Sequence, residues 1–317
     1  MRVTIVIPTL GRAQLLGRVL DRLAGQRGSP ADFEVIVVAD AKEQDLGSVA
    51  KVISGRPYAL RLLQAGRDGV SAARNAGWQA ATGELVLFFG DDMLPHPRLL
   101  REHLRWHERR PDDRVAVLGH VRWARELRLT PFMRWLDHGV QFDYPRIRGT
   151  DAGWGRFYAA NVSLKRSLLK RSGGFDETYR FGYEELELAY RLNALGLRLL
   201  YNRRAVVEHL HPPTIEEWQR RMAVVAGAER RFVAEHPDVR PYFFDMFRRA
   251  QGAPRARGRG TRLTGVVPRR VPWLGPRVWN SADAYYRQAL ARAFIDAWEA
   301  GVADETGKRA AIDRPSR

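Results

Sequence analysis

The first hundred residues alternate short apolar runs with amphipathic segments. Four apolar runs have the length of a strand, namely residues 3–7, 34–38, 60–64 and 84–89. Three intervening segments repeat apolar positions at helical spacing, namely residues 14–26, 46–53 and 71–81. Parallel strands that are covered on both faces appear as continuous apolar runs joined by helical crossovers. The pattern therefore predicts an α/β fold with a mostly parallel sheet flanked by helices, rather than a sandwich or a helical bundle.

The pattern is less regular beyond residue 111. It predicts short strands at 114–118 and 158–164, and helices at 131–137, 184–195, 215–234 and 282–300. From residue 248 the composition shifts to Arg, Gly and Pro. We predict one domain over residues 1–250 with two halves, 1–110 and 111–250, and a C-terminal extension over 251–317 that combines a basic linker with an amphipathic helix.

Composition excludes several classes of protein. The chain has no Cys, which rules out disulfides, thiolate metal sites and cysteine nucleophiles. No apolar run reaches the ~18 residues of a membrane span, and the N-terminal run is too short for a signal peptide, so we expect a cytoplasmic protein. The net charge of +17 suggests an anionic partner. Nearly all the cations are Arg, which genomic base composition alone can produce, and no nucleic-acid-reading module is present, so nucleic acid is not expected.

Ligands of open α/β sheets bind at the carboxyl ends of the strands, so polar residues that follow the apolar runs are candidates. The first such ending, Pro8 to Arg12, lacks the Gly-x-Gly-x-x-Gly turn of dinucleotide binders and the Lys of a phosphate loop. Asp40 follows the second run. It is placed to accept hydrogen bonds from a base or a ribose, or else to cap a helix.

The fourth run ends in Gly90-Asp91-Asp92. One or two carboxylates together with substrate phosphates form the usual site of Mg²⁺, so the pair indicates a place for a metal and a diphosphate. Neighbouring side chains of an extended chain point in opposite directions. Either Gly90 lets the chain turn both carboxylates inward, or one binds metal and the other holds a ribose hydroxyl. A solvated turn is the alternative.

Five ordered blocks together resemble glycosyltransferase family 2, whose fold is called GT-A. The blocks are Val3 to Thr9, Ser71 to Gly77, Gly90 to Asp92, Gly173 to Glu177 and Glu184 to Leu192. The resemblance covers most of residues 1–236 and implies that the first half binds a nucleotide sugar. The second half then supplies the acceptor side and the catalytic base.

The resemblance assigns roles residue by residue. It implies that Pro8, Thr9 and Asp40 contact the nucleoside, and that Arg74 and Asn75 lie near the diphosphate. Asp91 and Asp92 correspond to the family's Asp-x-Asp element, with Asp92 on Mg²⁺ or Mn²⁺ and Asp91 assisting. The chain departs from the family in having Gly90 where many relatives have the first Asp, and Ala39 where an Asp pair is usual.

The family's catalytic base corresponds to Glu185. A transfer from a sugar nucleotide needs one base to deprotonate the acceptor hydroxyl and one cation to stabilise the departing diphosphate. Glu is longer than Asp, so Glu184 remains an alternative base. Both residues also suit a helix N-terminal turn, where negative charge is favourable.

Histidines and aromatic residues supply further candidates. His209 follows a strand-like segment where some family members place a third metal ligand, and His211 lies two residues on. His103 and His107 have helical spacing but lack the Glu of a metalloprotease motif, so we interpret them as a pair on a helix surface. Trp154, Phe157 and Tyr158 could stack on a sugar, although buried aromatic residues usually form core.

The sequence thus predicts a metal-dependent, inverting glycosyltransferase that moves a sugar from a nucleotide sugar to a hydroxyl acceptor, with lipid-linked glycans among the candidate acceptors. A sugar nucleotidyltransferase and a non-catalytic binding protein are the alternatives. Residues 248–317 hold 15 basic and six acidic residues, interleaved with Trp273, Trp279, Tyr285 and Tyr286. This mixture suits peripheral binding to the inner face of an anionic membrane, or else a basic tail whose helix packs on the protein.

Overall fold

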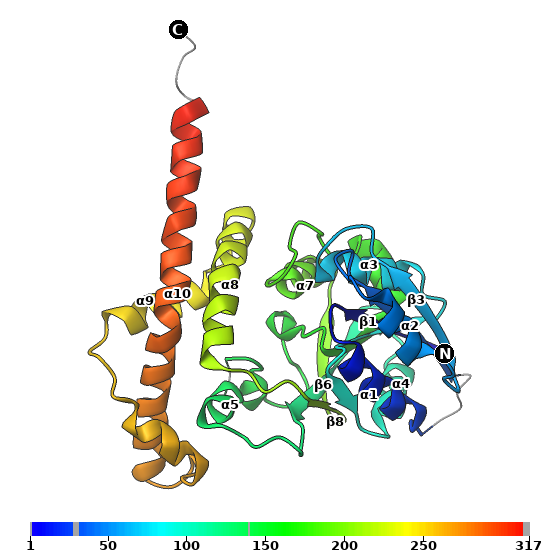
Figure 1. Cartoon of the computed structure of the whole chain (residues 1–317), viewed down its shortest axis with the longest axis horizontal. Coiled ribbons are helices and arrows are strands. Elements are labelled where there is room, and N and C mark those ends of the chain that lie inside the picture. The colour runs from blue at the N-terminus through cyan, green and yellow to red at the C-terminus, as the bar shows by residue number, and fades with distance from the viewer. Residues whose placement is uncertain (1, 28–31, 139, 313–317) are drawn as a thin grey trace. The chain divides into compact units, whose positions relative to one another are not determined.

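The computed structural model describes residues 2–27, 32–138 and 140–312 (Figure 1). Its contacts divide the chain into two compact units. Unit 1 comprises Met1–Arg128, Asp137–Arg180 and Glu184–His211, and unit 2 comprises Leu129–Leu136, Phe181–Tyr183 and Pro212–Arg317. The domain boundary expected near residue 250 stays a prediction.

Unit 1 is built on an eight-stranded sheet. The strands are β1 (Val3–Thr9), β2 (Phe33–Ala39), β3 (Ala59–Gln64), β4 (Leu85–Phe89), β5 (Met93–Pro95), β6 (Val115–Trp123), β7 (Asn161–Lys165) and β8 (Arg198–His209). They lie in the order β3-β2-β1-β4-β7-β6-β8-β5. The first four are parallel, as the apolar runs predict, whereas β7 and β5 are antiparallel to their neighbours. The predicted α/β class is confirmed.

Helices surround this sheet. They are α1 (Ala13–Ala24), α2 (Leu46–Ile53), α3 (Val70–Gln79), α4 (Leu99–Arg109), α6 (Arg166–Ser172) and α7 (Glu184–Ala194), with short 3₁₀ turns η2 (Tyr144–Arg146) and η3 (Trp154–Arg156). α3 packs closely on β1 because it carries Gly77. A Cβ atom at Gly77 would lie only 2.3 Å from Cγ1 of Val6, so a larger residue would push the helix off the sheet.

The sheet curls, and the short link between β4 and β5 requires it. β4 lies in the middle of the strand order and β5 at one edge, four strand spacings away. Four spacings of ~4.8 Å amount to ~19 Å, whereas the chain from Phe89 to Met93 spans at most ~14 Å. The sheet therefore bends back on itself at Asp91 and Asp92, and these two residues lie between its centre and its edge.

Unit 2 is helical. It contains α5 (Pro131–Leu136), α8 (Ile215–Glu235), α9 (Tyr242–Gly252), η4 (Gly258–Gly265) and α10 (Leu274–Ile312), and α10 runs alongside α8 (Figure 1). Its core is largely aromatic, with Trp135, Phe232, Phe247 and Phe294 at most 2% exposed. No helix in the described parts of the chain is both long and apolar enough to cross a membrane.

Two predicted elements need corrected bounds, and two helices were not predicted. The strand expected at 158–164 starts only at Asn161, because residues 158–161 form a turn in which the Asn161 N–H donates to the Tyr158 carbonyl at 3.2 Å. The helix expected at 282–300 is α10, which begins at Leu274 and extends to Ile312. The sequence predictions did not include α6 and α9.

The expectation that His103 and His107 lie on a helix surface is wrong. Both side chains are fully buried beneath β7. His107 Nε2 lies 2.9 Å from Ser163 Oγ, which lies 2.7 Å from His103 Nδ1, and His103 Nε2 lies 2.9 Å from Asn161 Oδ1. This chain of hydrogen bonds satisfies both ring nitrogens of His103 and Nε2 of His107, whereas Nδ1 of His107 is buried without a partner among the described residues.

Candidate active site

Three polar side chains meet at the carboxyl edge of the parallel strands. Thr9 ends β1, Asp40 follows β2 and Asp91 follows β4. The Asp40 N–H donates to the Thr9 carbonyl at 2.9 Å, and the Thr9 hydroxyl donates to Asp91 Oδ2 at 2.8 Å. The strand ends therefore form one connected polar edge, where α/β proteins bind ligands.

Asp91 and Asp92 both face the guanidinium of Arg12. Arg12 Nη1 lies 3.4 Å from Asp91 Oδ1 and 2.9 Å from Asp92 Oδ2. Of the two arrangements open at the sequence level, the chain adopts the one that brings both carboxylates to one place. Sequence reasoning missed Arg12; the available signal was a cation three residues beyond the end of β1.

The two carboxylates have opposite protonation behaviour. Burial and the neighbouring charge of Asp92 raise the pKa of Asp91 to about 6. Burial also acts to raise the pKa of Asp92, but the hydrogen bond and charge of His209, together with the charge of Arg12, outweigh burial and lower that pKa. Asp92 is thus the carboxylate that stays ionised and suits a cation best.

His209 lies beside Asp92 because of strand pairing. β5 runs antiparallel to β8, with Met93 opposite His209, and the Leu210 N–H donates to the Asp92 carbonyl at 2.9 Å. His209 Nε2 lies 3.3 Å from Asp92 Oδ2. The Trp123 ring stacks on the imidazole, with ring centroids 5.2 Å apart, and so fixes its plane.

The donor set is chemically suited to a divalent cation. Carboxylate oxygens suit Mg²⁺ and Mn²⁺, and imidazole also binds transition metals. His209 Nδ1 is buried and has no hydrogen-bond partner among the described residues. Within that same part of the chain, no group of three or more acidic or His side chains is already arranged to hold a metal. The residues therefore fit a cation that takes its remaining ligands from a substrate.

Packing explains the departure at Gly90. A Cβ atom there would lie 2.9 Å from Cγ of Met93 and 3.0 Å from Oδ1 of Asp92. An Asp at position 90 would therefore displace the Asp92 carboxylate. Gly90 leaves the Asp92 carboxylate in place, but the chain then lacks the first Asp that many family members have.

A second charged cluster joins α3 to the start of α7. Arg74 Nη1 lies 3.0 Å from Glu184 Oε1, and Arg74 Nη2 lies 3.0 Å from Glu185 Oε1. The guanidinium also lies over the Phe175 ring, 5.3 Å from its centroid. Arg74 is thus held by the two candidate bases in this arrangement, whereas its expected position near the diphosphate stays a prediction.

The two glutamates differ in exposure. The side chain of Glu184 is 7% exposed and that of Glu185 is 25% exposed. Burial raises the pKa of Tyr144 and Tyr158, and the charge of Glu185 adds to this effect, so Glu185 lies near these two aromatic residues. Glu185 is therefore the more accessible of the two glutamates, and Tyr144 and Tyr158 lie near it.

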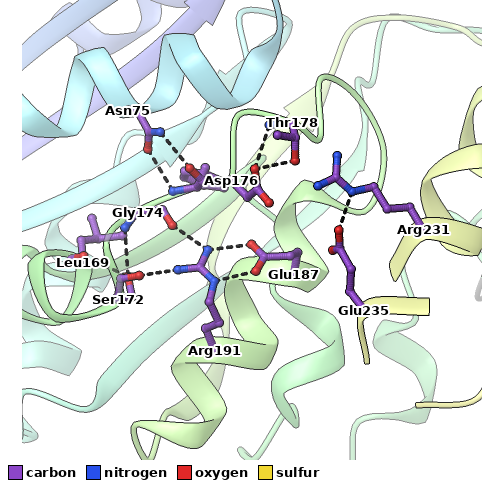
Figure 2. Close-up of polar contacts among 11 residues, drawn as sticks. Asn75, Leu169, Ser172, Gly174, Asp176, Thr178, Glu187, Arg191, Arg231 and Glu235 are labelled. Carbon is purple, nitrogen blue, oxygen red and sulfur yellow. Dashed lines mark hydrogen bonds and ion pairs between the residues drawn. The ribbon is translucent and has the colours of Figure 1, made fainter. Parts of the chain in front are cut away.

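The Asn75 side chain is hydrogen-bonded within the protein. Its Oδ1 accepts the Phe175 N–H and Trp78 Nε1, both at 2.9 Å, and its Nδ2 donates to the Phe175 carbonyl at 2.9 Å and to Glu177 Oε1 at 3.1 Å. Figure 2 shows this amide directed at the segment that follows α6. All four of its hydrogen-bonding positions are used within the protein. The expected donor contact of Asn75 stays a prediction.

Asp40 and Pro8 complete the expected donor side. Asp40 is buried, and its oxygens accept the Lys42 N–H at 2.9 Å and the Gly69 N–H at 2.8 Å. Asp40 thereby links the end of β2 to the start of α3. Pro8 lies within β1 opposite Val38, one residue before Thr9. Both residues line the polar edge, and their contacts with a nucleoside stay predictions.

Comparison with known proteins identifies the family. Residues 4–172 match the family model described as glycosyl transferase family 2, and this stretch covers more than half of the chain. The chain belongs to glycosyltransferase family 2. The match spans β1 to α6 and thus includes the polar edge with Asp91 and Asp92. Membership confirms the predicted family.

Curated proteins named as glycosyltransferases are similar in sequence. The validoxylamine A glucosyltransferase of Streptomyces hygroscopicus subsp. limoneus is 29% identical over 76% of this chain and 58% of its own length. The pre-mycofactocin glycosyltransferase of Mycobacterium tuberculosis is 31% identical over 74% of this chain and 48% of its own length. The chain thus spans only about half to three fifths of these relatives.

Solved structures confirm the GT-A fold of this family 2 chain. The mannosyltransferase PcManGT from Pyrobaculum calidifontis, solved with GDP-Man and Mn²⁺, superposes with a TM-score of 0.56 at 22% identity, covering 99% of this chain and 81% of that one. Residues 1–349 of TarS from S. aureus, solved with UDP, give 0.53 at 17% identity, covering 96% and 92%.

Proposed function

We propose that this chain is a metal-dependent, inverting glycosyltransferase that moves a sugar from a nucleoside diphosphate sugar to a hydroxyl acceptor. The observation that carries the proposal is the contact of Asp92 with His209 beside Asp91, at the carboxyl edge of a family 2 sheet. The GDP-Man and Mn²⁺ of PcManGT and the UDP of TarS lend support, because both proteins share this fold.

On the donor side, Asp92 and His209 would hold Mg²⁺ or Mn²⁺, with Asp91 assisting. A divalent cation supplies positive charge that stabilises the diphosphate as it leaves. Arg12 adds a second positive charge at the same place. Thr9, through its hydrogen bond, fixes the orientation of the Asp91 carboxylate.

On the acceptor side, Glu185 is the proposed base. The oxygen of the acceptor hydroxyl forms a bond to the anomeric carbon, the bond from that carbon to the diphosphate oxygen breaks, and the hydroxyl proton passes to Glu185. Attack from the face opposite the diphosphate inverts the anomeric centre. Arg74 is a positioning residue, because it holds the carboxylates of Glu184 and Glu185 in fixed orientations.

The proposal is tested by product analysis with a panel of UDP, GDP, dTDP and CDP sugars, with Mn²⁺ or EDTA. We expect one donor to yield a nucleoside diphosphate, by transfer or slow hydrolysis, only when metal is present. Asp92→Ala and Glu185→Gln should each lose at least ~100-fold in kcat, with donor binding weakened mainly in the first. Glu108→Gln, at an exposed glutamate of α4, is the matched control.

Two outcomes would overturn the proposal. Release of pyrophosphate from a sugar phosphate and a nucleoside triphosphate would identify a nucleotidyltransferase instead. Donor binding without turnover, unaffected by metal and by Asp92→Ala, would identify a non-catalytic binding protein.

A further inference from the structure

The segment from Met246 to Ala282 in unit 2 carries a charge of one sign only. Its 37 residues include nine Arg and no Lys, Asp or Glu. They form the end of α9, then η4, a loop and the first turns of α10. Arg262, Arg269, Arg270 and Arg277 are all exposed. Arg248 pairs with Glu299 of α10 at 2.9 Å. The remaining excess of positive charge on this segment attracts polyanions.

Large apolar side chains are exposed within the same segment. Trp273 is 83% exposed, Val266 75%, Leu274 51% and Leu263 45%. Together they account for four of the ten large apolar residues that are exposed in the described parts of the chain. We call residues 262–277 the basic apolar loop. Exposed apolar side chains that gather in one short segment mark an interaction surface.

The basic apolar loop is held in a defined shape. The Gly275 N–H donates to the Val271 carbonyl at 2.9 Å and the Val267 N–H to the Leu263 carbonyl at 2.8 Å. Trp273 has a φ of +58°, a left-handed conformation that is strained for a bulky residue. The fold therefore keeps an indole in water on a strained backbone, which costs stability and indicates a use outside unit 2.

Two of the neighbouring aromatic residues that the sequence offered for membrane contact, Trp279 and Tyr286, are occupied elsewhere. Trp279 is 6% exposed, and its Nε1 donates to the Val267 carbonyl at 2.9 Å. Tyr286 is 4% exposed and packs against Phe132 and Trp135. These two residues support the loop and the α10 helix from inside, so Trp273 is the aromatic residue that the loop presents outward.

We propose that the basic apolar loop docks on the surface of an anionic phospholipid bilayer. Trp273, Val266 and Leu274 would enter the headgroup layer, where amphipathic indole rings are favoured, and the Arg side chains would contact the phosphates. A soluble polyanion would account for the arginines but leaves the exposed apolar residues without a partner. The proposal stands on unit 2 alone and does not rest on the proposed transferase activity.

Co-sedimentation of the full chain with vesicles tests the proposal. Binding should be strong to vesicles of phosphatidylcholine with ~30% phosphatidylglycerol and weak to vesicles of phosphatidylcholine alone. Added salt should weaken the binding to the anionic vesicles. Arg269→Gln with Arg270→Gln should lower the partition coefficient about 25-fold, because each basic residue near an anionic surface contributes a factor of about five. Arg101→Gln with Arg109→Gln, both exposed on α4, is the matched control.

The apolar side chains need their own variants. Trp273→Ala and Val266→Ser should each lower the partition coefficient at least about fivefold, since each removes apolar area that docking would bury. Val224→Ser, at a valine that is 52% exposed on α8, should leave it unchanged. All seven substituted positions are exposed, so thermal melting should confirm that the variants remain folded.

Three results would overturn the proposal. One is equal binding of the wild type to anionic and neutral vesicles. Another is equal losses in the loop variants and their controls. The third is binding to heparin that matches vesicle binding and is insensitive to Trp273→Ala, which would make the loop a site for soluble polyanions.

Discussion

Arg12 Nη1 lies 2.9 Å from Oδ2 of Asp92. The same nitrogen reaches Asp91, so one partly exposed cation offsets the charge of two buried carboxylates. A pair of adjacent buried carboxylates is unfavourable without such an opposite charge. Arg12 therefore stabilises the site in the protein alone, and a bound cation would partly take over this task.

Arg12→Gln should make the protein depend more on divalent metal. Loss of the guanidinium leaves the carboxylates without their nearest cation, which costs about 1–3 kcal/mol and lowers Tm by about 2–4 °C in EDTA. Mn²⁺ should then raise the Tm of the variant by more than it raises that of the wild type. Differential scanning fluorimetry with and without Mn²⁺ measures both shifts.

Arg18→Gln is the control for that measurement. Arg18 pairs with Glu126 on the surface, where both side chains are about half exposed, at 45% and 52%. Exposed pairs contribute little, so Arg18→Gln should change neither Tm nor the response to metal. An Arg12→Gln variant that is as stable as the wild type in EDTA would contradict the role given to Arg12.

Arg74→Lys should reduce kcat by at least tenfold while changing the KM for the donor little. A Lys ammonium is a single point charge and cannot hold Glu184 and Glu185 in the geometry that the guanidinium fork provides. A misplaced base affects the chemical step more than donor binding. Steady-state kinetics with the donor varied at saturating acceptor separate the two parameters.

Arg191→Lys is the matched substitution for this comparison. Arg191 binds both oxygens of Glu187 at 2.6 Å and the carbonyls of Ser172 and Gly174, and so ties α7 to the end of α6 (Figure 2). Its loss should lower Tm with a smaller effect on kcat. If Arg74→Lys also acts only through Tm, then Arg74 is a structural residue and not a positioning residue.

The sequence predicted the parts of the fold that local periodicity encodes. The parallel strands β1 to β4 are continuous apolar runs because helices cover both faces of that part of the sheet, and their crossovers show helical spacing. β5 has only three residues, Met93–Pro95, and exists because β8 lies beside it. A three-residue strand carries no pattern of its own, so local reasoning could not find it.

The residues of the candidate site also divide into those that a local pattern reveals and those that only distant contacts reveal. Asp91 and Asp92 could be found because charged residues at the end of an apolar run break a local pattern, whereas Glu185 was assigned through the resemblance to the family. The contacts of Arg12 with Asp92 and of Arg74 with Glu184 and Glu185 could not be found, because each joins residues about 80 to 110 positions apart. The burial of His103 depends in the same way on β7.

Stability should fall between pH 7 and pH 5 because of the buried histidines. Burial lowers the pKa of His103 to about 4 and that of His107 to about 3. Below pH 6.5 the unfolded chain binds protons that the folded chain does not, so the free energy of unfolding decreases as pH falls. Each histidine should contribute about 2 kcal/mol over this range. Urea denaturation at the two pH values measures the change.

Substitution assigns that change to the histidines. His107→Gln should remove about half of the loss between pH 7 and pH 5, whereas His96→Gln, at an exposed histidine, should leave most of it. Comparing the pH dependence of each variant with that of the wild type cancels the contributions of other groups that titrate in the same pH range, such as Asp91. A His107→Gln variant with the full pH dependence would show that the histidine is not buried as a neutral ring.

Glu229 should couple energetically to Tyr183, the residue directly before Glu184. The buried Glu229 carboxylate accepts a hydrogen bond from the Tyr183 hydroxyl. It also accepts the N–H groups of Phe243 and Phe244, in the first turn of α9, at 2.7 and 2.8 Å. Glu229→Gln and Tyr183→Phe should each destabilise the protein by about 1–3 kcal/mol. The double variant should lose less than the sum by about 1–2 kcal/mol. Urea denaturation of the wild type, the two single variants and the double variant measures this coupling. If the two losses of stability are strictly additive, packing and not the hydrogen bond holds Tyr183 in its left-handed conformation, at φ of 65°.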